Sequence, residues 1–237
     1  MRIPVVLPLA GSLALVLSPL LPAQSGNFEI AQNGQRVGTA SFQFTATKDG
    51  YDSTSLVQVT MQGLNYALSK SEELTSANQL RHVLLSATVN GSAVNVVAKP
   101  DSDQILMNIS ADGRSSTARL AGHAGAVFLP DFDPGALETL LAVAVQQNSR
   151  DLWAILPKNA GSIEPVQLAT YPDVQGTLDG KTILVHHLIA TIASANADLF
   201  SGPENQLLQA ELPQQGFALV RKGFVLTPPA KPIVPAQ

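Results

Sequence analysis

The stretch that decides the fold class is residues 28–61, which read FEIAQNGQRVGTASFQFTATKDGYDSTSLVQVTM. Apolar and polar residues alternate in three runs of this stretch, and a period of two residues is typical of β-strands. The runs are Phe28–Gln32, Arg36–Thr45 and Tyr51–Met61. Asn33-Gly34 separates the first two, and this dipeptide favours a type I′ hairpin turn because both central positions need a positive φ. The stretch therefore predicts antiparallel strands joined by tight turns.

The alternation also assigns a face to each side chain in these strands. In Arg36–Thr45, one face carries Ala40, Phe42 and Phe44, whereas the residues between them are mostly polar. We expect the phenylalanine face to be buried and the other face to be wetter, as in a half-solvated antiparallel sheet. In Tyr51–Met61, Leu56 is one register away from its apolar neighbours Val57 and Val59.

Runs of the same kind continue along the chain. Before residue 121 they are Tyr66–Leu74, Leu80–Val89, Ala93–Ala98, Ile105–Ser110 and Ser115–Leu120. After residue 150 they are Leu152–Leu156, Ile163–Tyr171, Gly176–Leu178, Thr182–Ile192, Leu207–Leu212 and Phe217–Val225, with a short strand and a loop within Asn196–Asn205. Tyr66–Leu74 is polar enough to indicate an exposed or edge strand. The pattern predicts a mainly β fold, either an antiparallel curved sheet or a barrel or half-barrel.

One segment has helical rather than strand periodicity. Asp133 precedes Pro134, which is the arrangement of an N-cap followed by proline at the first helical position. Apolar residues then recur at helical spacing from Leu137 to Val145, and Asn148-Ser149 ends the segment. We expect a helix over Asp133–Ser149 that packs on the sheet or plugs an open end of the barrel.

The composition excludes several classes of function. Of the 237 residues, 45% are hydrophobic and 14% charged, which favours a packed globular domain over a disordered chain. A net charge of -4 leaves too little positive charge to neutralise several phosphates, so we expect no nucleic-acid partner. Because the chain has no cysteine, it has no disulfide, no thiolate metal site and no cysteine nucleophile.

The N-terminal segment has the pattern of a secretory signal peptide. Arg2 supplies a cation, residues 3–21 are apolar, and small residues allow cleavage after Ala23 or after Ser25. Prolines interrupt the apolar run, which favours a cleaved signal over a retained membrane anchor. We therefore expect a signal peptide (1–25), a single antiparallel β domain (27–226) and a Pro-rich disordered tail (227–237). The location would be periplasmic or extracellular, with no membrane span after cleavage.

Few side chains are candidates for chemistry. His186 and His187 are adjacent in a predicted strand, so their rings should point to opposite faces. The ring that faces the interior could join His123 with Asp131 or Asp133 in a metal or acid–base site, since imidazole and carboxylate groups suit zinc. Ligand spacing such as His-x-x-x-His is absent, and strand histidines satisfied by their neighbours are the simpler interpretation.

Other motifs are better explained by caps and turns. Asp131-Phe132-Asp133 could pair two carboxylates, but Pro134 favours a capping role for Asp133. Asp101-Ser102-Asp103 and Asp112-Gly113 lack the full pattern of a calcium loop and suit turns. The sequence contains no Gly-x-Ser-x-Gly nucleophile elbow and no phosphate-binding loop. We therefore assign no catalytic, cofactor-binding or metal-binding residues.

The opening and closing hairpins resemble one family. The opening hairpin runs from Phe28-Glu29-Ile30 through Gly34 to Val37-Gly38-Thr39, and the closing pair is Leu207–Pro213 followed by Gly216–Arg221. They resemble bacterial exported β-barrel proteins of unknown function that are related in shape to the LolA and LolB lipoprotein carriers. The resemblance spans the mature chain and implies a curved antiparallel sheet that wraps a helix or an apolar cavity. It implies no catalytic residues.

The sequence therefore predicts an exported, non-enzymatic β-barrel module of the bacterial cell envelope. Its interior would hold an apolar small molecule or a lipid, or only a packed core, and it would need no cofactor. One alternative is a metal-dependent or acid–base hydrolase that uses His123, Asp131 and either His186 or His187. Another is an envelope scaffold or interaction protein whose proline-rich tail reaches a partner. The oligomeric state does not follow from the sequence.

Overall fold

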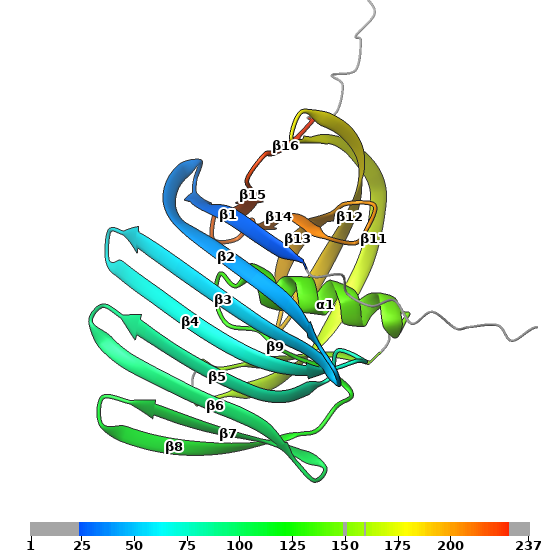
Figure 1. Ribbon diagram of the computed structural model, residues 1–237. Coiled ribbons are helices and arrows are strands. Elements are labelled where there is room, and N and C mark those ends of the chain that lie inside the picture. Colours follow the sequence, from blue (N-terminus) through cyan, green and yellow to red (C-terminus); the bar gives the residue numbers. More distant parts are fainter. Residues whose placement is uncertain (1–23, 149–150, 159, 228–237) are drawn as a thin grey trace, which may run out of the picture.

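The computed structural model describes residues 24–148, 151–158 and 160–227. These residues form the mainly β fold that the sequence predicts, with one large, curved sheet that does not close into a barrel, and one helix (Figure 1). Residues 1–23 and 228–237, which hold most of the expected signal peptide and most of the expected tail, lie outside the described residues.

The first half of the sheet consists of eight strands in chain order. They are β1 (Ser25–Gln32), β2 (Gln35–Thr47), β3 (Gly50–Met61), β4 (Leu64–Thr75), β5 (Leu80–Val89), β6 (Ser92–Asp101), β7 (Gln104–Ala111) and β8 (Arg114–Ala121). Each pairs antiparallel with the next. Asn33 and Gly34 have φ angles of 49° and 80°, so both positions of the first turn have the positive φ that the sequence predicts.

The second half of the sheet contains the remaining strands. They are β9 (Gly125–Phe128), β10 (Leu152–Leu156), β11 (Ser162–Leu178), β12 (Lys181–Ile192), β13 (Ala195–Ser201), β14 (Leu207–Leu212), β15 (Phe217–Arg221) and β16 (Phe224–Leu226). β15 pairs with β1, and this pairing joins the two halves. β9 and β10 are parallel, because a helix rather than a hairpin connects them.

The prediction of an edge strand over Tyr66–Leu74 is wrong. β4 lies inside the sheet and pairs with β3 on one side and β5 on the other. Its polar residues Lys70 and Glu72, which suggested exposure, are buried on the same face as Leu68 and Leu74. Charged side chains at inward positions of a strand are rare, because burying a charge is unfavourable unless it is paired.

Three predictions in the second half also differ from the structure. The runs Ile163–Tyr171 and Gly176–Leu178 form one strand, β11, in which a bulge after Tyr171 accommodates Pro172 without ending the pairing with β12. The single strand expected over Phe217–Val225 is two strands, β15 and β16, divided by a turn that contains Gly223 at φ 82°. β9 is missing from the predicted strands, since its four residues are all buried and show no alternation.

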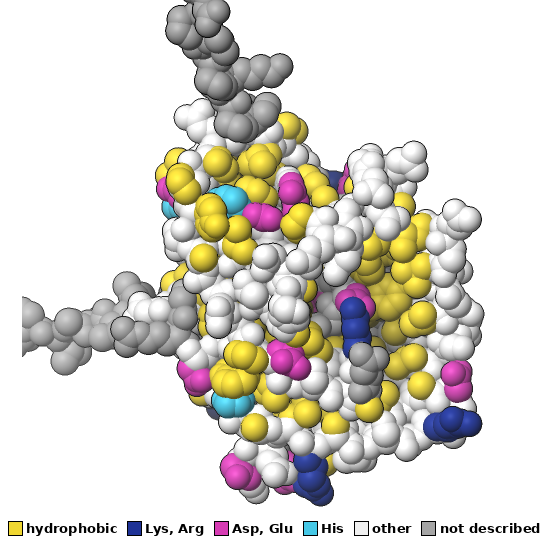
Figure 2. All heavy atoms as spheres, turned by 180° about the vertical axis from the view of Figure 1, so that it is seen from behind, with side chains coloured by type: hydrophobic (Ala, Val, Ile, Leu, Met, Phe, Trp, Pro, Cys, Tyr) yellow, Lys and Arg dark blue, Asp and Glu magenta, His cyan; other side chains and the backbone are white. Residues whose placement is uncertain are grey.

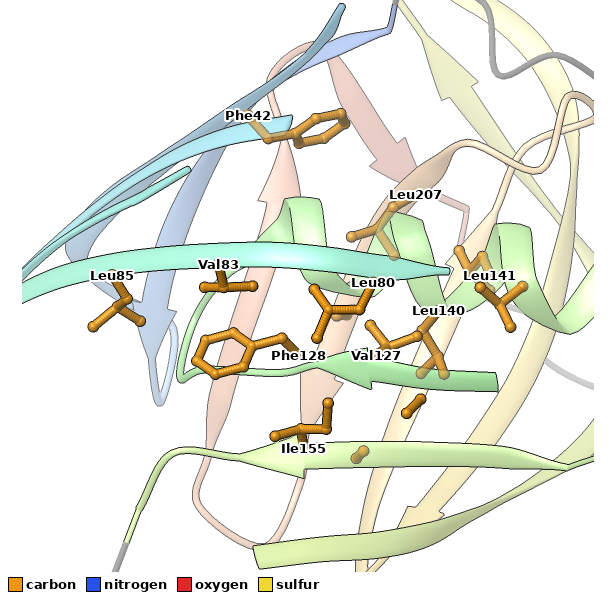
Figure 3. Packing of buried hydrophobic residues seen from close by; sticks show 14 of the residues in the cluster. Phe42, Leu80, Val83, Leu85, Val127, Phe128, Leu140, Leu141, Ile155 and Leu207 are labelled. Carbon is orange, nitrogen blue, oxygen red and sulfur yellow. The ribbon is translucent and has the colours of Figure 1, made fainter. Parts of the chain in front are cut away.

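The main core lies on the concave face of the sheet, as the alternation predicts. Phe42 and Phe44 are buried there, whereas Leu56 is 58% exposed on the opposite face. Figure 3 shows how side chains of the two halves, such as Val83 and Ile155, meet around Phe128. Much of the concave face is therefore buried between the two halves of the sheet.

A second, smaller core lies on the opposite face of the second half. It consists of Val185, Phe200, Leu208 and Phe224. Neighbouring residues of one strand point to opposite faces, so Leu199 packs in the main core while Phe200 packs in the second core. β16 covers this second core by returning to pair with the far end of β11.

Helix α1 (Pro134–Gln146) lies on the concave side and contacts strands of both halves (Figure 1). It begins where the sequence predicts, with Asp133 as the N-cap, and its C-cap is Gln147. A Cβ on Gly135 would come within 2.6 Å of the Ser55 Oγ atom and 2.9 Å of the Phe42 Cβ atom. The glycine therefore lets the first helical turn lie directly against β2 and β3.

Within the part of the chain that the structure describes, no helix has both the length and the apolar character needed to cross a membrane.

Candidate functional site

The first turn of α1 is fixed by its N-cap residue. The Asp133 Oδ1 atom accepts hydrogen bonds from the backbone N–H groups of Gly135 at 2.9 Å and of Ala136 at 3.2 Å. These N–H groups have no partner within the helix, and Pro134 has no N–H to satisfy. The capping role that the sequence predicts for Asp133 is therefore confirmed.

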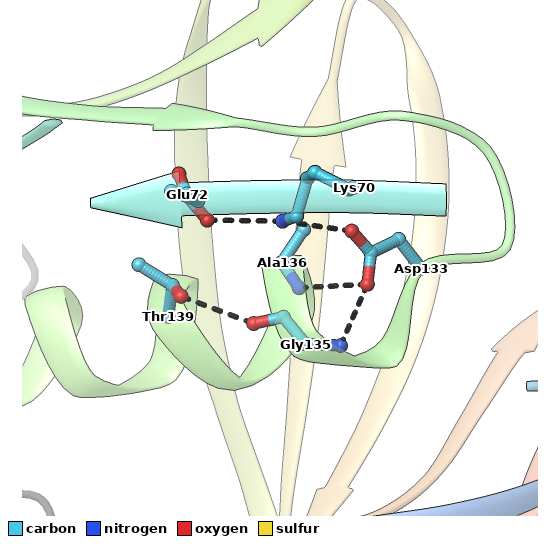
Figure 4. A network of polar contacts seen from close by, with 6 residues as sticks. All are labelled: Lys70, Glu72, Asp133, Gly135, Ala136 and Thr139. Carbon is cyan, nitrogen blue, oxygen red and sulfur yellow. Dashed lines mark hydrogen bonds and ion pairs between the residues drawn. The ribbon is translucent and has the colours of Figure 1, made fainter. Parts of the chain in front are cut away.

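The other carboxylate oxygen of Asp133 joins a buried ion-pair cluster. The Lys70 Nζ atom lies 2.8 Å from the Asp133 Oδ2 atom and 2.9 Å from the Glu72 Oε2 atom. All three side chains are 0% exposed or nearly so, and Figure 4 shows Lys70 between the two carboxylates. A strand of the first half is thus tied to the start of the helix by charge.

Burial and charge act in opposite directions on these groups. Burial lowers the pKa of Lys70, but Asp133 and Glu72 together outweigh it and raise the pKa above its usual value. Lys70 therefore stays protonated. Burial raises the pKa of Glu72, and Lys70 offsets this only in part. Burial thus disfavours the ionised form of Glu72, whereas the neighbouring Lys70 cation favours it.

Further polar side chains surround this cluster on β3. In the β3–β4 register, Ser53 is opposite Glu72 and Ser55 is opposite Lys70. The hydroxyl oxygens of both serines and the Oε1 atom of Glu72 are buried and make no hydrogen bond with the described residues. The cluster therefore makes a polar island beneath the first turn of α1, inside an otherwise apolar core.

An apolar pocket of about 250 Å³ lies beside this island. Its apolar lining comes from both the helix side and the second half of the sheet, and includes Leu129, Leu137, Leu156, Ile192, Ala197 and Leu219. Asp131, Asp133, Lys158 and Gln215 add polar groups to the lining. Pockets for small organic ligands are usually apolar with a few polar groups, and their volume is ~300–1,000 Å³. This pocket has the same kind of lining and a volume just below that range, which suits a small apolar molecule.

The rim of the pocket carries a second lysine–aspartate pair. The Lys158 Nζ atom lies 2.6 Å from the Asp131 Oδ1 atom, and the two side chains are 61% and 44% exposed. Figure 2 shows a hollow on this side of the molecule, lined with hydrophobic side chains and with an acidic and a basic side chain at its edge. Asp131 and Asp133, two residues apart, thus bind different lysines in different surroundings.

Phe132 stands between these two aspartates and lines the pocket. Its ring packs edge-on against Phe217 at 4.8 Å and against Tyr66 at 6.1 Å between ring centroids. Burial, with Asp131 and Asp133 adding to it, raises the pKa of the Tyr66 hydroxyl above its usual value, so Tyr66 is neutral. The pocket is therefore bordered by an aromatic row that holds no charge.

Glu138 is a buried acid on α1 that the sequence pattern did not single out. Its Oε2 atom accepts a hydrogen bond from the Leu207 backbone N–H at 2.6 Å, which links the helix to β14. Burial raises the pKa of Glu138 from its ordinary value of 4.5 to about 7, although the Leu207 hydrogen bond and Arg221 lower it. Glu138 is thus a titratable contact between the helix and the second half.

The candidate residues of the hydrolase alternative lie in separate surroundings. His123 stacks on Trp153 at 3.7 Å between ring centroids, and its Nδ1 atom is 3.9 Å from the Asp151 Oδ1 atom. Asp131 is engaged by Lys158 at the pocket rim. His123 and Asp131 therefore have different partners, and none of these contacts joins them.

His186 and His187 likewise have different partners. His186 Nδ1 is 3.0 Å from Asp173 Oδ1 on β11, and His187 Nε2 is 2.7 Å from Asp198 Oδ1 on β13. No group of three or more histidine, aspartate and glutamate side chains suited to a metal ion occurs among residues 24–148, 151–158 and 160–227. Each candidate histidine is therefore paired locally with one carboxylate.

The chain was compared with protein-family models, with curated proteins and with solved structures, and no match was found in any of the three comparisons.

Replacing Lys70 tests whether the buried ion pair holds the helix start. Lys70→Met should lower the free energy of unfolding by about 3–5 kcal/mol, because it leaves Asp133 and Glu72 buried without a cation. The matched control is Lys158→Met, which removes the exposed partner of Asp131 and should cost less than about 1 kcal/mol. Urea denaturation measures both. Equal losses in the two variants would contradict the assignment.

Replacing Glu138 tests its raised pKa. The folded state binds the Glu138 proton more tightly than the unfolded state, so its stability falls as the pH rises from about 4.5 to 7. Relative to Glu138→Gln, the wild type should therefore lose up to about 3 kcal/mol of stability as the pH rises through this window. Above the window the difference between the two proteins should stay constant. Denaturant titrations at a series of pH values measure this difference. A constant difference across the window would refute the assignment.

Proposed function

We propose that this protein is an exported, non-enzymatic binding protein of the bacterial cell envelope that holds an apolar small molecule or an acyl chain of a lipid. The observation that carries the proposal is the apolar pocket between α1 and the second half of the sheet. Leu137, Ile192 and Leu219 offer it a surface without hydrogen-bonding groups, and apolar ligands are stabilised by leaving water for such a surface.

The polar groups near the pocket support binding rather than catalysis. Asp133 caps the helix and pairs with Lys70, and Asp131 pairs with Lys158. An acid–base reaction needs a titratable group within hydrogen-bonding reach of the substrate and a partner that tunes it. Here the two aspartates that line the pocket are already engaged by cations.

The pocket is also supported by fixed elements. α1 is held to β4 by the Lys70–Asp133 pair and to β14 by the Glu138–Leu207 hydrogen bond. A binding surface that is ordered before the ligand arrives loses less conformational entropy on binding. This arrangement supports a preformed site of limited size.

A periplasmic or extracellular location is part of the proposal. The Gln24 carbonyl accepts a hydrogen bond from the Phe44 N–H at 2.7 Å, and the Ser25 carbonyl accepts one from Arg221 at 2.6 Å. Cleavage after Ala23 would keep both bonds, whereas cleavage after Ser25 would remove both carbonyls. The first of the two cleavage positions is therefore the one that we propose.

The binding proposal is tested with an apolar fluorescent probe. N-phenyl-1-naphthylamine should bind the purified protein with increased fluorescence, and octanoic acid should displace it. Ala197→Phe, which fills the pocket, should weaken binding at least about tenfold, a loss of about 1.4 kcal/mol. Ala195→Phe, at a half-buried lining position, serves as a second variant if the first does not fold by circular dichroism. Leu56→Ala on the outer face is the control.

Probe binding that is absent, or equally strong in the pocket variants and the control, would reject the binding proposal.

Export is tested by expressing the full chain in a Gram-negative host. The intact mass of the protein from the periplasmic fraction should correspond to a chain that begins at Gln24, because this terminus keeps the bonds of Gln24 and Ser25. Recovery of the uncleaved chain from the cytoplasm alone would contradict the proposed location.

A further inference from the structure

Phe132 is part of the pocket lining, and apolar side chains continue beyond it on the first half of the sheet. Its ring also packs against Tyr66, which is not part of the pocket lining. Tyr66 belongs to a set of incompletely buried apolar residues on the concave face of β3–β7, which we name the apolar wall. The apolar wall consists of Met61, Leu64, Tyr66, Val89, Val94 and Ile109.

The strand register makes the apolar wall one surface. Met61 is opposite Leu64, Tyr66 is opposite Val89, and Val94 lies opposite Ala87, two residues before Val89 on β5. Opposed side chains on one face of a sheet are in contact distance of each other. The hydrophobic hollow in Figure 2 accords with an apolar surface that faces solvent on this side of the molecule. Phe132 thus stands between the apolar pocket and the apolar wall.

The backbone of Phe132 is held in an unfavourable conformation. Its φ is 58°, in the left-handed region, and the other non-glycine residues with positive φ in the described ranges are Asn, Asp, Ser or Ala. A bulky side chain there is strained, and such strain persists only where the surroundings enforce it. Asp133, the next residue, is held in the core by the buried pair with Lys70 and supplies part of this constraint.

The two flanking pairs differ in how easily they separate. Asp133 is buried and paired with Lys70, and separating that pair would leave charges in the core. Asp131 and Lys158 are exposed, and water can replace each partner for the other at little cost. The loop is therefore held more firmly where it enters α1 than at Asp131.

We propose that Phe132 is a partition that sets the chain length of the ligand: a short acyl chain fits the pocket alone, whereas a long acyl chain displaces the Phe132 ring and lies in the pocket and along the apolar wall together. This inference rests on the proposed function. The occupant of the apolar wall is the far end of the same chain, because the wall is continuous with the pocket at Phe132.

The test compares octanoic and hexadecanoic acid, each below its micelle concentration, by displacement of N-phenyl-1-naphthylamine. Val94→Asp places a charge on the apolar wall and should weaken hexadecanoic acid binding at least about tenfold, while octanoic acid binding changes less than about twofold. Leu56→Asp, the same chemistry on the outer face, should alter neither affinity. Circular dichroism verifies that each variant folds.

A second variant tests the partition itself. Phe132→Gly removes the ring and suits a positive φ, so hexadecanoic acid should associate at least about threefold faster while octanoic acid gains nothing. Stopped-flow fluorescence measures these rates. Unchanged rates, or an equal change for both acids in Val94→Asp, would overturn the role of Phe132 and the apolar wall while leaving the pocket proposal intact. Failure of both acids to bind wild type would reject the proposed function and this inference together.

Discussion

The ion pair between Lys70 and Asp133 is the contact on which the arrangement of the site depends. It joins the fourth strand of the first half to the first residue of the segment that crosses the concave face. Two charges that are buried and matched fix a distance and a direction, which apolar contacts alone do not. It fixes the start of the helix and the loop before it, and the Glu138–Leu207 hydrogen bond joins the same helix to the second half of the sheet.

Three consecutive residues of the loop before α1 have different surroundings. Asp131 is held at the surface, Phe132 separates two apolar regions, and Asp133 is anchored in the core. The chain passes from solvent to core within these three residues, and the middle one has a left-handed backbone.

Much of the architecture follows from local patterns, and the rest depends on pairings that local patterns do not contain. Alternation identifies the buried face through Phe42 and Phe44, and Asp133-Pro134 identifies the helix start. The same alternation places Lys70 on the face of Leu68, but its charge suggests exposure. Its burial depends on ion pairs with Glu72 and with Asp133, and Asp133 is far from it in the sequence. The pocket combines the loop before α1 with strands far along the chain, so no single stretch of sequence could indicate it.

The pairing of the first strand with the fifteenth has a consequence for the order of folding. Phe28 lies opposite Arg221, so the two halves join only when nearly the whole domain is available. The hairpins of the first half form from neighbouring residues, whereas closing so long a loop is slow. During that interval the apolar inner surface of the first half is uncovered and can contact other chains. Aggregation through this surface therefore stops only when the late strands have paired.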